Sequence, residues 1–457
     1  MTSVGDNLRS LGKETAALYA FAAQAWAAAS GLVLLLLATS QLTPSQQGYF
    51  FTFSSLLLVQ SLIDVGFAVV LTQFVSHEWA HLRLEGGRVV GDDRAAPRLA
   101  SLLRLGLRWY GVVAVALLVG LGVGGHLFFT LSPYADAAVD WTAPWWTLCG
   151  ATALAALAVP LSASLEGTGQ VAANQRSLLL ANVMAGLAAW LALLLGAHLW
   201  SVVVLVGVRA LLAHAQLIPA AWPLLRLTRE LPEGPSVGWR TEFWPQQWRI
   251  AASWAAGLLM FQSFVPIAFQ VQGPVLAGQV GVLTQAFRAV NQLGSAWLTA
   301  AQPEMGHLAA LGRADDLRTL VRTTVQRCVA TAAVIALSAF AFIAVLEVAR
   351  PRYAERFGDL LSVATFVGIA VALQLSNVET AAIRFQKSEP FVMVSWIAAV
   401  ALVVSNVLLG YAFGTRGIGL GFMAVTLCLL IPWVHNIYQR DMMIFQRRAE
   451  ARELAST

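Results

Sequence analysis

The segment 276–302 places an arginine and several amides within a long apolar run. A guanidinium carries several fixed hydrogen-bond donors, and a carboxamide both donates and accepts. Such groups can bind an anion together with neutral hydroxyls, so we predict a helix that lines a wet polar cavity, the alternative being hydrogen bonding between neighbouring helices. The polar residues recur at three- and four-residue steps and therefore share one helix face: Gln285, Arg288, Gln292, Ser295, Thr299 and Gln302.

Two further charges lie inside apolar runs. Asp64, with Gln60 one helical turn before it, stands in SLLLVQSLIDVGFAVVLTQF. At 1.5 Å per residue, Arg288 lies about 18 Å and Arg209 about 14 Å along their runs, near the middle of a bilayer. A charge at that depth costs roughly 2.5–3.5 kcal/mol, so it should face protein or water. For Asp64 and for Arg209, both a structural ion pair and a functional role stay open.

The composition is that of a membrane protein. Hydrophobic residues make up 58% and charged residues 12% of the 457 residues, whereas soluble domains average about 25% charged residues. The three cysteines lie within apolar runs and form no CxxC motif, which argues against a disulfide framework and against a metal site. The net charge of +5 is concentrated between the apolar runs, so we interpret the arginines as topology determinants and expect no nucleic-acid binding.

The apolar runs predict an all-α, polytopic protein with twelve transmembrane helices, the first of them an uncleaved N-terminal span. Cations gather after the even-numbered spans and at both termini, which predicts cytoplasmic termini. The segment 349–359 is an exception, because its arginines lie on the predicted external side of the membrane, beside three carboxylates. The predicted spans are 16–38, 48–74, 105–131, 144–166, 177–197, 200–225, 248–270, 276–302, 323–348, 358–382, 390–412 and 416–438.

A charged segment rich in proline and glycine divides the spans into two sets of six. Because six is even, both sets begin on the same side of the membrane, and any repeat is parallel. The predicted parts are an N-terminal six-helix lobe, 1–225, a cytoplasmic linker, 226–247, a C-terminal six-helix lobe, 248–438, and a cytoplasmic tail, 439–457.

Motifs for catalysis are weak. No GxxxxGK[ST] sequence is present, so we expect no ATP hydrolysis. HEWAHL, 77–82, matches the HExxH zinc pattern, but it lies at the end of a predicted span without a nearby third ligand. The predicted external loops are too short to hold a catalytic site. We therefore expect a transport protein without a cofactor or metal, and not an enzyme.

The stretch LTPSQQGYFFTFSSLLLVQSLIDVGFAVVLTQFVSHEW, 42–79, resembles the second-span region of bacterial oligosaccharide flippases. These form the Wzx-like, polysaccharide-transporter branch of the multidrug/oligosaccharidyl-lipid/polysaccharide (MOP) superfamily. Asp64 and Gly66 match its acidic-x-Gly pattern, and twelve spans favour this branch over the fourteen usual in lipid II flippases. The resemblance implies a MATE-like, V-shaped pair of lobes, with spans one, two, seven and eight lining a central cavity.

The resemblance also implies a substrate and a site. The substrate would be an oligosaccharide on an undecaprenyl-type polyprenyl pyrophosphate, moved from the inner to the outer leaflet of the bacterial cytoplasmic membrane during surface polysaccharide biosynthesis. Arg288, with Arg249 at the cytoplasmic mouth, would bind the pyrophosphate, and Asp64 would couple transport to protons. Glycan polymerases, glycosyltransferases and membrane lipids are the expected partners. Further candidate ligands are Arg209, Gln60, Gln262, Gln285, Asn291, Gln292, Trp26, Trp254 and Trp297.

Two alternatives remain. A proton- or sodium-coupled drug antiporter of the same superfamily would have a carboxylate on its first span, where this chain has Gln24 as the most polar buried residue. Arg288 would also repel an organic cation. A non-transporting scaffold of a glycan-assembly complex would not require the polar helix face.

Overall fold

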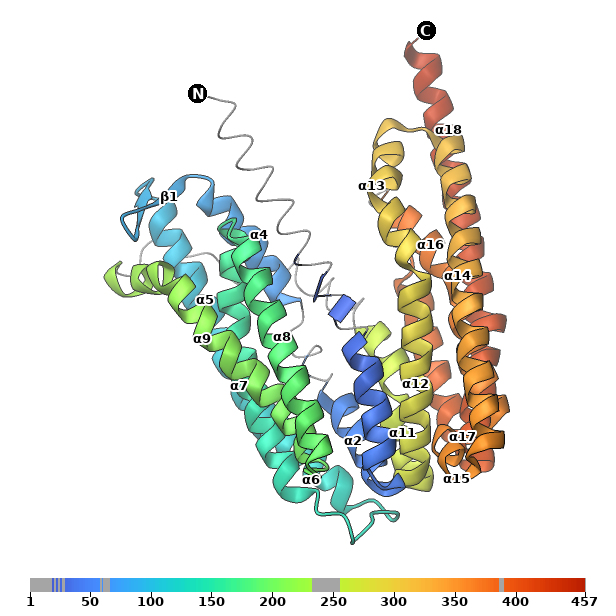
Figure 1. Cartoon of the computed structure of the whole chain (residues 1–457). Helices are drawn as coiled ribbons and strands as arrows, with labels where there is room; N and C mark the ends of the chain where they lie inside the picture. The colour runs from blue at the N-terminus through green and yellow to red at the C-terminus, as the bar shows by residue number, and fades with distance from the viewer. Residues whose placement is uncertain are drawn as a thin grey trace. The chain divides into compact units, whose positions relative to one another are not determined.

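The computed structural model describes residues 19, 22–23, 25–26, 29–57, 60, 66–231, 255–385 and 390–456 (Figure 1). Over these residues the chain is helical apart from one two-stranded hairpin. Seven helices in this part of the chain are long and apolar enough to cross a bilayer, and the bent pair Ala255–Gln262 and Phe264–Gln272 makes an eighth. The predicted fold class is confirmed: the protein is an all-α, multi-pass membrane protein.

The chain divides into two compact units, Met1–Trp254 and Ala255–Thr457. The predicted linker begins inside a helix that continues to Glu230, and its remainder lies almost entirely outside the described residues. Unit 1 contains an apolar helix, Ala29–Gln41, and α2 (Pro44–Leu57), α4 (Phe67–Trp79), β1 (Leu82–Glu85), β2 (Arg88–Gly91), α5 (Ala95–Val115), the π-helix η1 (Ala116–Leu121), α6 (Gly122–Thr130), α7 (Thr142–Gly167), α8 (Val171–Leu194) and α9 (Trp200–Glu230).

Unit 2 contains the bent pair and two long helical pairs, and the predicted tail forms the end of its last helix. Its elements are α11 (Phe264–Gln272), α12 (Pro274–Gly294), α13 (Ala296–Leu311), α14 (Ala314–Ala349), α15 (Pro351–Ala354), the 3-10 helix η3 (Glu355–Phe357), α16 (Leu360–Arg384), α17 (Val392–Val425), the π-helix η4 (Thr426–Leu430) and α18 (Ile431–Ser456).

Helix α7 is the centre of unit 1 and packs against α4, α5 and α9, with α8 beside α9 (Figure 1). Small residues permit the closest approach: a Cβ atom on Gly167 would lie 2.6 Å from Cγ1 of Val75 on α4. Thr72 donates a hydrogen bond of 3.3 Å to the carbonyl of Ala163 at the same interface. Within a bilayer, such close packing and interhelical hydrogen bonding replace the hydrophobic effect in holding helices together.

The hairpin between α4 and α5 was not predicted, although its signal is present in the sequence. Gly86 and Gly87 both have positive φ angles, 55° and 76°, and Glu85 pairs with Arg88 across this two-residue turn. Two positive φ angles are typical of a type I′ turn, for which glycine has no steric penalty. The hairpin therefore forms from residues too polar to continue the predicted span.

Helix α16 is the corresponding centre of unit 2 and packs against α12, α14, α17 and α18. The prediction of one continuous helix over 276–302 is wrong in detail, because α12 ends at Gly294 and α13 begins at Ala296. At the break the backbone approaches α14 closely: a Cβ atom on Gly294 would lie 2.7 Å from the Cβ of Ala332. The polar face is therefore shared between two helices.

The predicted break between the last two spans coincides with a reversal of the chain at Gly414, whose φ and ψ are 59° and −135°. Residues on the two sides face each other, because Cβ atoms on Gly410 and Gly421 would approach Ile418 and Ser405, respectively. The long helical stretch Val392–Arg448 is therefore an antiparallel pair of crossings. Only glycine adopts this backbone conformation without strain.

Candidate functional site

The guanidinium of Arg288 lies half-buried on α12. Its Nη2 donates a hydrogen bond to Oε1 of Gln262, which ends the first arm of the bent pair, where the axis turns by 42°. In the described part of the chain, no carboxylate forms an ion pair with Arg288. One amide engages one of the five N–H donors of a guanidinium, so most of its hydrogen-bonding capacity and its positive charge are available to a ligand.

The other amides on this face differ in their surroundings. Gln285, one turn before Arg288, is half-buried like it, and Gln292, one turn after, is exposed. With Gln262, these side chains place amide groups on both sides of the guanidinium along α12. The arrangement suits a ligand with an anionic centre and flanking hydroxyl groups.

Asn291 contributes to a polar contact between α12 and α16. Its Oδ1 accepts hydrogen bonds from Nε2 of Gln374 at 3.1 Å and from Nδ2 of Asn377 at 3.0 Å. The hydroxyl of Ser295 donates to Oε1 of the same fully buried glutamine at 3.0 Å. The alternative of helix–helix hydrogen bonding thus describes Asn291 and Ser295 well, while a role of Asn291 in ligand binding stays a prediction.

Trp297 lies on α13 with 45% of its surface exposed. Its indole Nε1 donates to Oγ1 of Thr331 at 2.9 Å, and the guanidinium carbon of Arg327 stands 5.4 Å from the ring centroid. Arg327 is exposed on α14, one turn before the threonine. Arg327 was not among the sequence candidates, although it lies inside a predicted span, where a cation is costly and therefore often functional.

The candidates of unit 1 are described only in part. Arg209 is exposed on α9, without an ion pair among the described residues, and Gln60 is half-buried. Trp26 packs against α8: its Nε1 donates to the carbonyl of Asn182 at 3.1 Å, and its ring lies 5.5 Å from that of Trp190. Three sequence candidates lie outside the described residues: Asp64, Arg249 and Trp254. Gln24, which weighed against a drug antiporter, lies outside them too.

Unit 2 contains a buried acid that was not among the sequence candidates. Glu379 on α16 is only 2% exposed, and its Oε1 lies 2.7 Å from Nδ1 of His435 on α18. Its Oε2 is buried without a hydrogen-bond partner in the described structure. His435 falls within the predicted last span, so a search for histidines in the spans would have found it.

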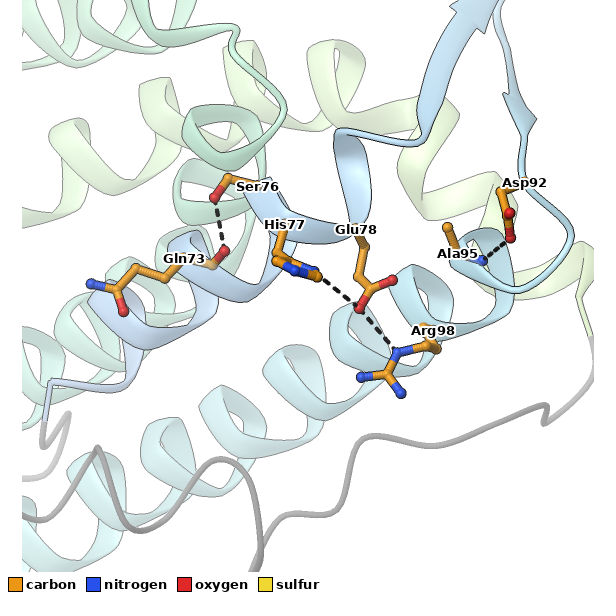
Figure 2. A network of polar contacts seen from close by, with 7 residues as sticks. All are labelled: Gln73, Ser76, His77, Glu78, Asp92, Ala95 and Arg98. Carbon is orange, nitrogen blue, oxygen red and sulfur yellow. Dashed lines mark hydrogen bonds and ion pairs between the residues drawn. The ribbon is translucent and has the colours of Figure 1, made fainter.

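The HExxH-like sequence is used for packing. Helix α4 ends at Trp79, so His81 lies beyond it and does not share a helix face with His77. Glu78 is 6% exposed, and its Oε1 accepts a 3.0 Å hydrogen bond from Nε of Arg98 on α5 (Figure 2). The pattern therefore joins α4 to α5 at this end of unit 1.

The sequence matches no protein-family model and no curated protein, but its structure resembles solved ones. An inward-facing multidrug resistance transporter of the MATE family, in the MOP superfamily, superposes with a TM-score of 0.63 at 17% identity, covering 92% of this chain and 96% of that one. The lipid II flippase MurJ, in an inward closed conformation, superposes with a TM-score of 0.56 at 9% identity, covering 95% of this chain and 91% of that one. The MATE transporter VcmN of Vibrio cholerae, in its bent form, superposes with a TM-score of 0.51 at 13% identity, covering 96% of this chain and 99% of that one.

The chain has the MOP-transporter fold. The matches cover nearly the whole chain and nearly the whole of each transporter, so both units belong to this one architecture. The fold is common to a multidrug resistance transporter and to a lipid II flippase, and therefore does not by itself select a substrate. That choice depends on the side chains of this chain.

Proposed function

We propose that this protein is a flippase of the Wzx-like type, which moves a polyprenyl-pyrophosphate-linked oligosaccharide from the inner to the outer leaflet of the bacterial cytoplasmic membrane by alternating access. The MOP fold supports a transporter of amphipathic or lipid-linked molecules. The observation that carries the choice of substrate is the half-buried guanidinium of Arg288, without a carboxylate partner in the described residues.

A lone cation at this depth favours an anionic ligand. Placing it in the membrane costs roughly 2.5–3.5 kcal/mol on insertion scales, and this cost is offset when an anion binds. A guanidinium forms paired, charge-assisted hydrogen bonds with phosphate oxygens. The pyrophosphate of the lipid carrier has both the charge and the geometry required.

The amides beside Arg288 would serve the first sugars. Gln262 and Gln285 present groups that donate and accept hydrogen bonds, as sugar hydroxyls require. The partly exposed indole of Trp297 on α13, with Arg327 over its ring, would offer an aromatic surface to a sugar. The polyprenyl tail would remain in the bilayer, where it needs no protein site.

Replacement of Arg288 tests the proposal. We expect Arg288→Ala to reduce translocation of undecaprenyl pyrophosphate carrying a short labelled oligosaccharide in proteoliposomes by about tenfold or more, because a charge-assisted contact is lost. Arg288→Lys keeps the charge but not the paired geometry, so its translocation should lie between that of the unmodified protein and that of Arg288→Ala. The control is Arg322→Ala, an exposed arginine on α14, which should transport normally. Normal translocation by Arg288→Ala in folded, inserted protein would remove Arg288 from the site.

The same vesicles separate the alternatives. A drug antiporter would move an organic cation such as ethidium against a proton or sodium gradient and would not flip the lipid-linked probe. A scaffold would move neither probe. Only translocation of the lipid-linked probe by the unmodified protein agrees with the proposal.

A further inference from the structure

One end of unit 2 contains an open cavity apart from the Arg288 region. Here α11 turns into α12, α15 and η3 join α14 to α16, and α17 reverses (Figure 1). The cavity measures about 680 Å³, a volume typical of small-molecule sites. This cavity is here named the outer pocket, and the polar and aromatic residues in its lining are Gln272, Gln279, Glu347, Glu355, Asp359, Phe413, Thr415 and Arg416.

The walls of the outer pocket are fixed by contacts between its elements. Nε2 of Gln279 on α12 donates a 2.8 Å hydrogen bond to the carbonyl of Glu355. Nε of Arg416, after the reversal of α17, donates to Oδ2 of Asp359 at 2.7 Å, while the hydroxyl of Ser362 donates to its other oxygen. The loops are thus joined to one another without a ligand, and the pocket is preformed.

The remaining groups point to a polyhydroxylated ligand. The carboxylates of Glu347 and Glu355 are exposed and form no ion pair within the described residues, so they are available as hydrogen-bond acceptors. No group of three or more His, Cys, Asp or Glu residues in this part of the chain is arranged to hold a metal ion. Phe413, 65% exposed, adds an apolar face. Two carboxylate acceptors and an aromatic ring, with the donors that Gln279 and Arg416 do not use in the walls, are groups that can bind a sugar.

We propose that the outer pocket binds sugar units of the translocated oligosaccharide on the external side of the membrane. The inference rests on the proposed function and on the predicted orientation, in which the loop 349–359 and the turn at Gly414 face outside. It adds a second sugar site, separate from the pyrophosphate site at Arg288. This site would hold the glycan on the external side after delivery. It would thereby oppose transport of the glycan back to the cytoplasmic side.

Binding of lipid-free glycans tests the outer pocket independently of transport. The full-length protein in nanodiscs is applied to a printed panel of bacterial surface oligosaccharides, and bound glycans are then titrated. We expect at least one to bind, and the double variant Glu347→Gln/Glu355→Gln to weaken its affinity about tenfold, since two charged acceptors are lost. Phe413→Ala should weaken it also. Glu304→Gln, an exposed acid on α13, and Arg288→Ala should bind as the unmodified protein does.

The external location of the outer pocket is tested in intact cells that carry a Phe413→Cys variant. A membrane-impermeant maleimide should label the cysteine at this position. Failure to label this cysteine, absence of any bound glycan, or equal affinity in the double variant would each overturn the outer pocket as a sugar site. Because Arg288→Ala blocks transport in the proposed function but leaves this binding intact, failure of one proposal is distinguishable from failure of the other.

Discussion

Arg288 and Glu379 show how differently two buried charges are held in the same unit. The carboxylate of Glu379 receives a hydrogen bond from His435 on another helix and is almost fully enclosed. The guanidinium of Arg288 meets one neutral amide and keeps most of its donors. A buried charge that is paired contributes mainly to structure, whereas one left with free donors is suited to a ligand.

We predict that the Glu379–His435 pair stabilises unit 2. His435→Ala leaves a buried carboxylate without its partner and should lower the free energy of unfolding in detergent by about 1–3 kcal/mol. The double variant Glu379→Gln/His435→Ala should lose less than the sum of the single variants, because the two residues are in contact. His307→Ala, an exposed histidine on α13, is the control. Additive losses would mean that the pair is not coupled.

At the scale of elements, the connection from α4 through the hairpin to α5 is organised by short-range contacts. Asp92 follows β2, and its Oδ1 accepts a hydrogen bond from the backbone N–H of Arg94 at 2.6 Å. The same oxygen accepts one from the backbone N–H of Ala95 at 3.1 Å (Figure 2). These donors hold the pKa of Asp92 below its ordinary value of 3.8. The carboxylate thus stabilises the start of α5 in its charged form.

Because the pKa of Asp92 is lower in the folded than in the unfolded chain, its contribution is complete above pH 3.8 and is lost as the pH falls through the folded value. Asp92→Asn keeps the hydrogen-bond acceptor but removes the charge. We expect this variant to lose less stability than the unmodified protein between about pH 5 and pH 3, measured as the unfolding midpoint in detergent. Asp93→Asn is the control, and an unchanged pH profile in Asp92→Asn would contradict the assignment.

At the scale of the whole molecule, the proposed transport must be linked to an energy source. The fold contains two units. Alternating access needs a free-energy input that changes the relative stability of the inward-facing and outward-facing states. Asp64 remains our candidate for that input by its sequence position and its acidic-x-Gly resemblance. A carboxylate within a span can bind a proton when it faces the external solution and release it inside.

We predict that Asp64→Asn makes translocation of the lipid-linked probe insensitive to an imposed pH gradient, because the amide cannot take up a proton. The unmodified protein should accelerate when the outside is made acidic. Rates are measured in the proteoliposomes used for Arg288, with equal pH on both sides as the reference. A gradient response in Asp64→Asn equal to that of the unmodified protein would leave Asp64 with a structural role.

The sequence by itself determined that this is an all-α membrane protein and located the break at Gly414, while the depth of Arg288 stays a prediction. These are local properties: span length follows from bilayer thickness, and depth follows from the rise of a helix. The Gly-Gly turn of the hairpin was equally local and could have been predicted. The tertiary structure alone decided which polar groups are engaged, because their partners are remote. Asn291 contacts Asn377, 86 residues away in the sequence, and Glu379 contacts His435, 56 residues away. Only the packing of the helices therefore shows that these groups are paired while Arg288 keeps free donors.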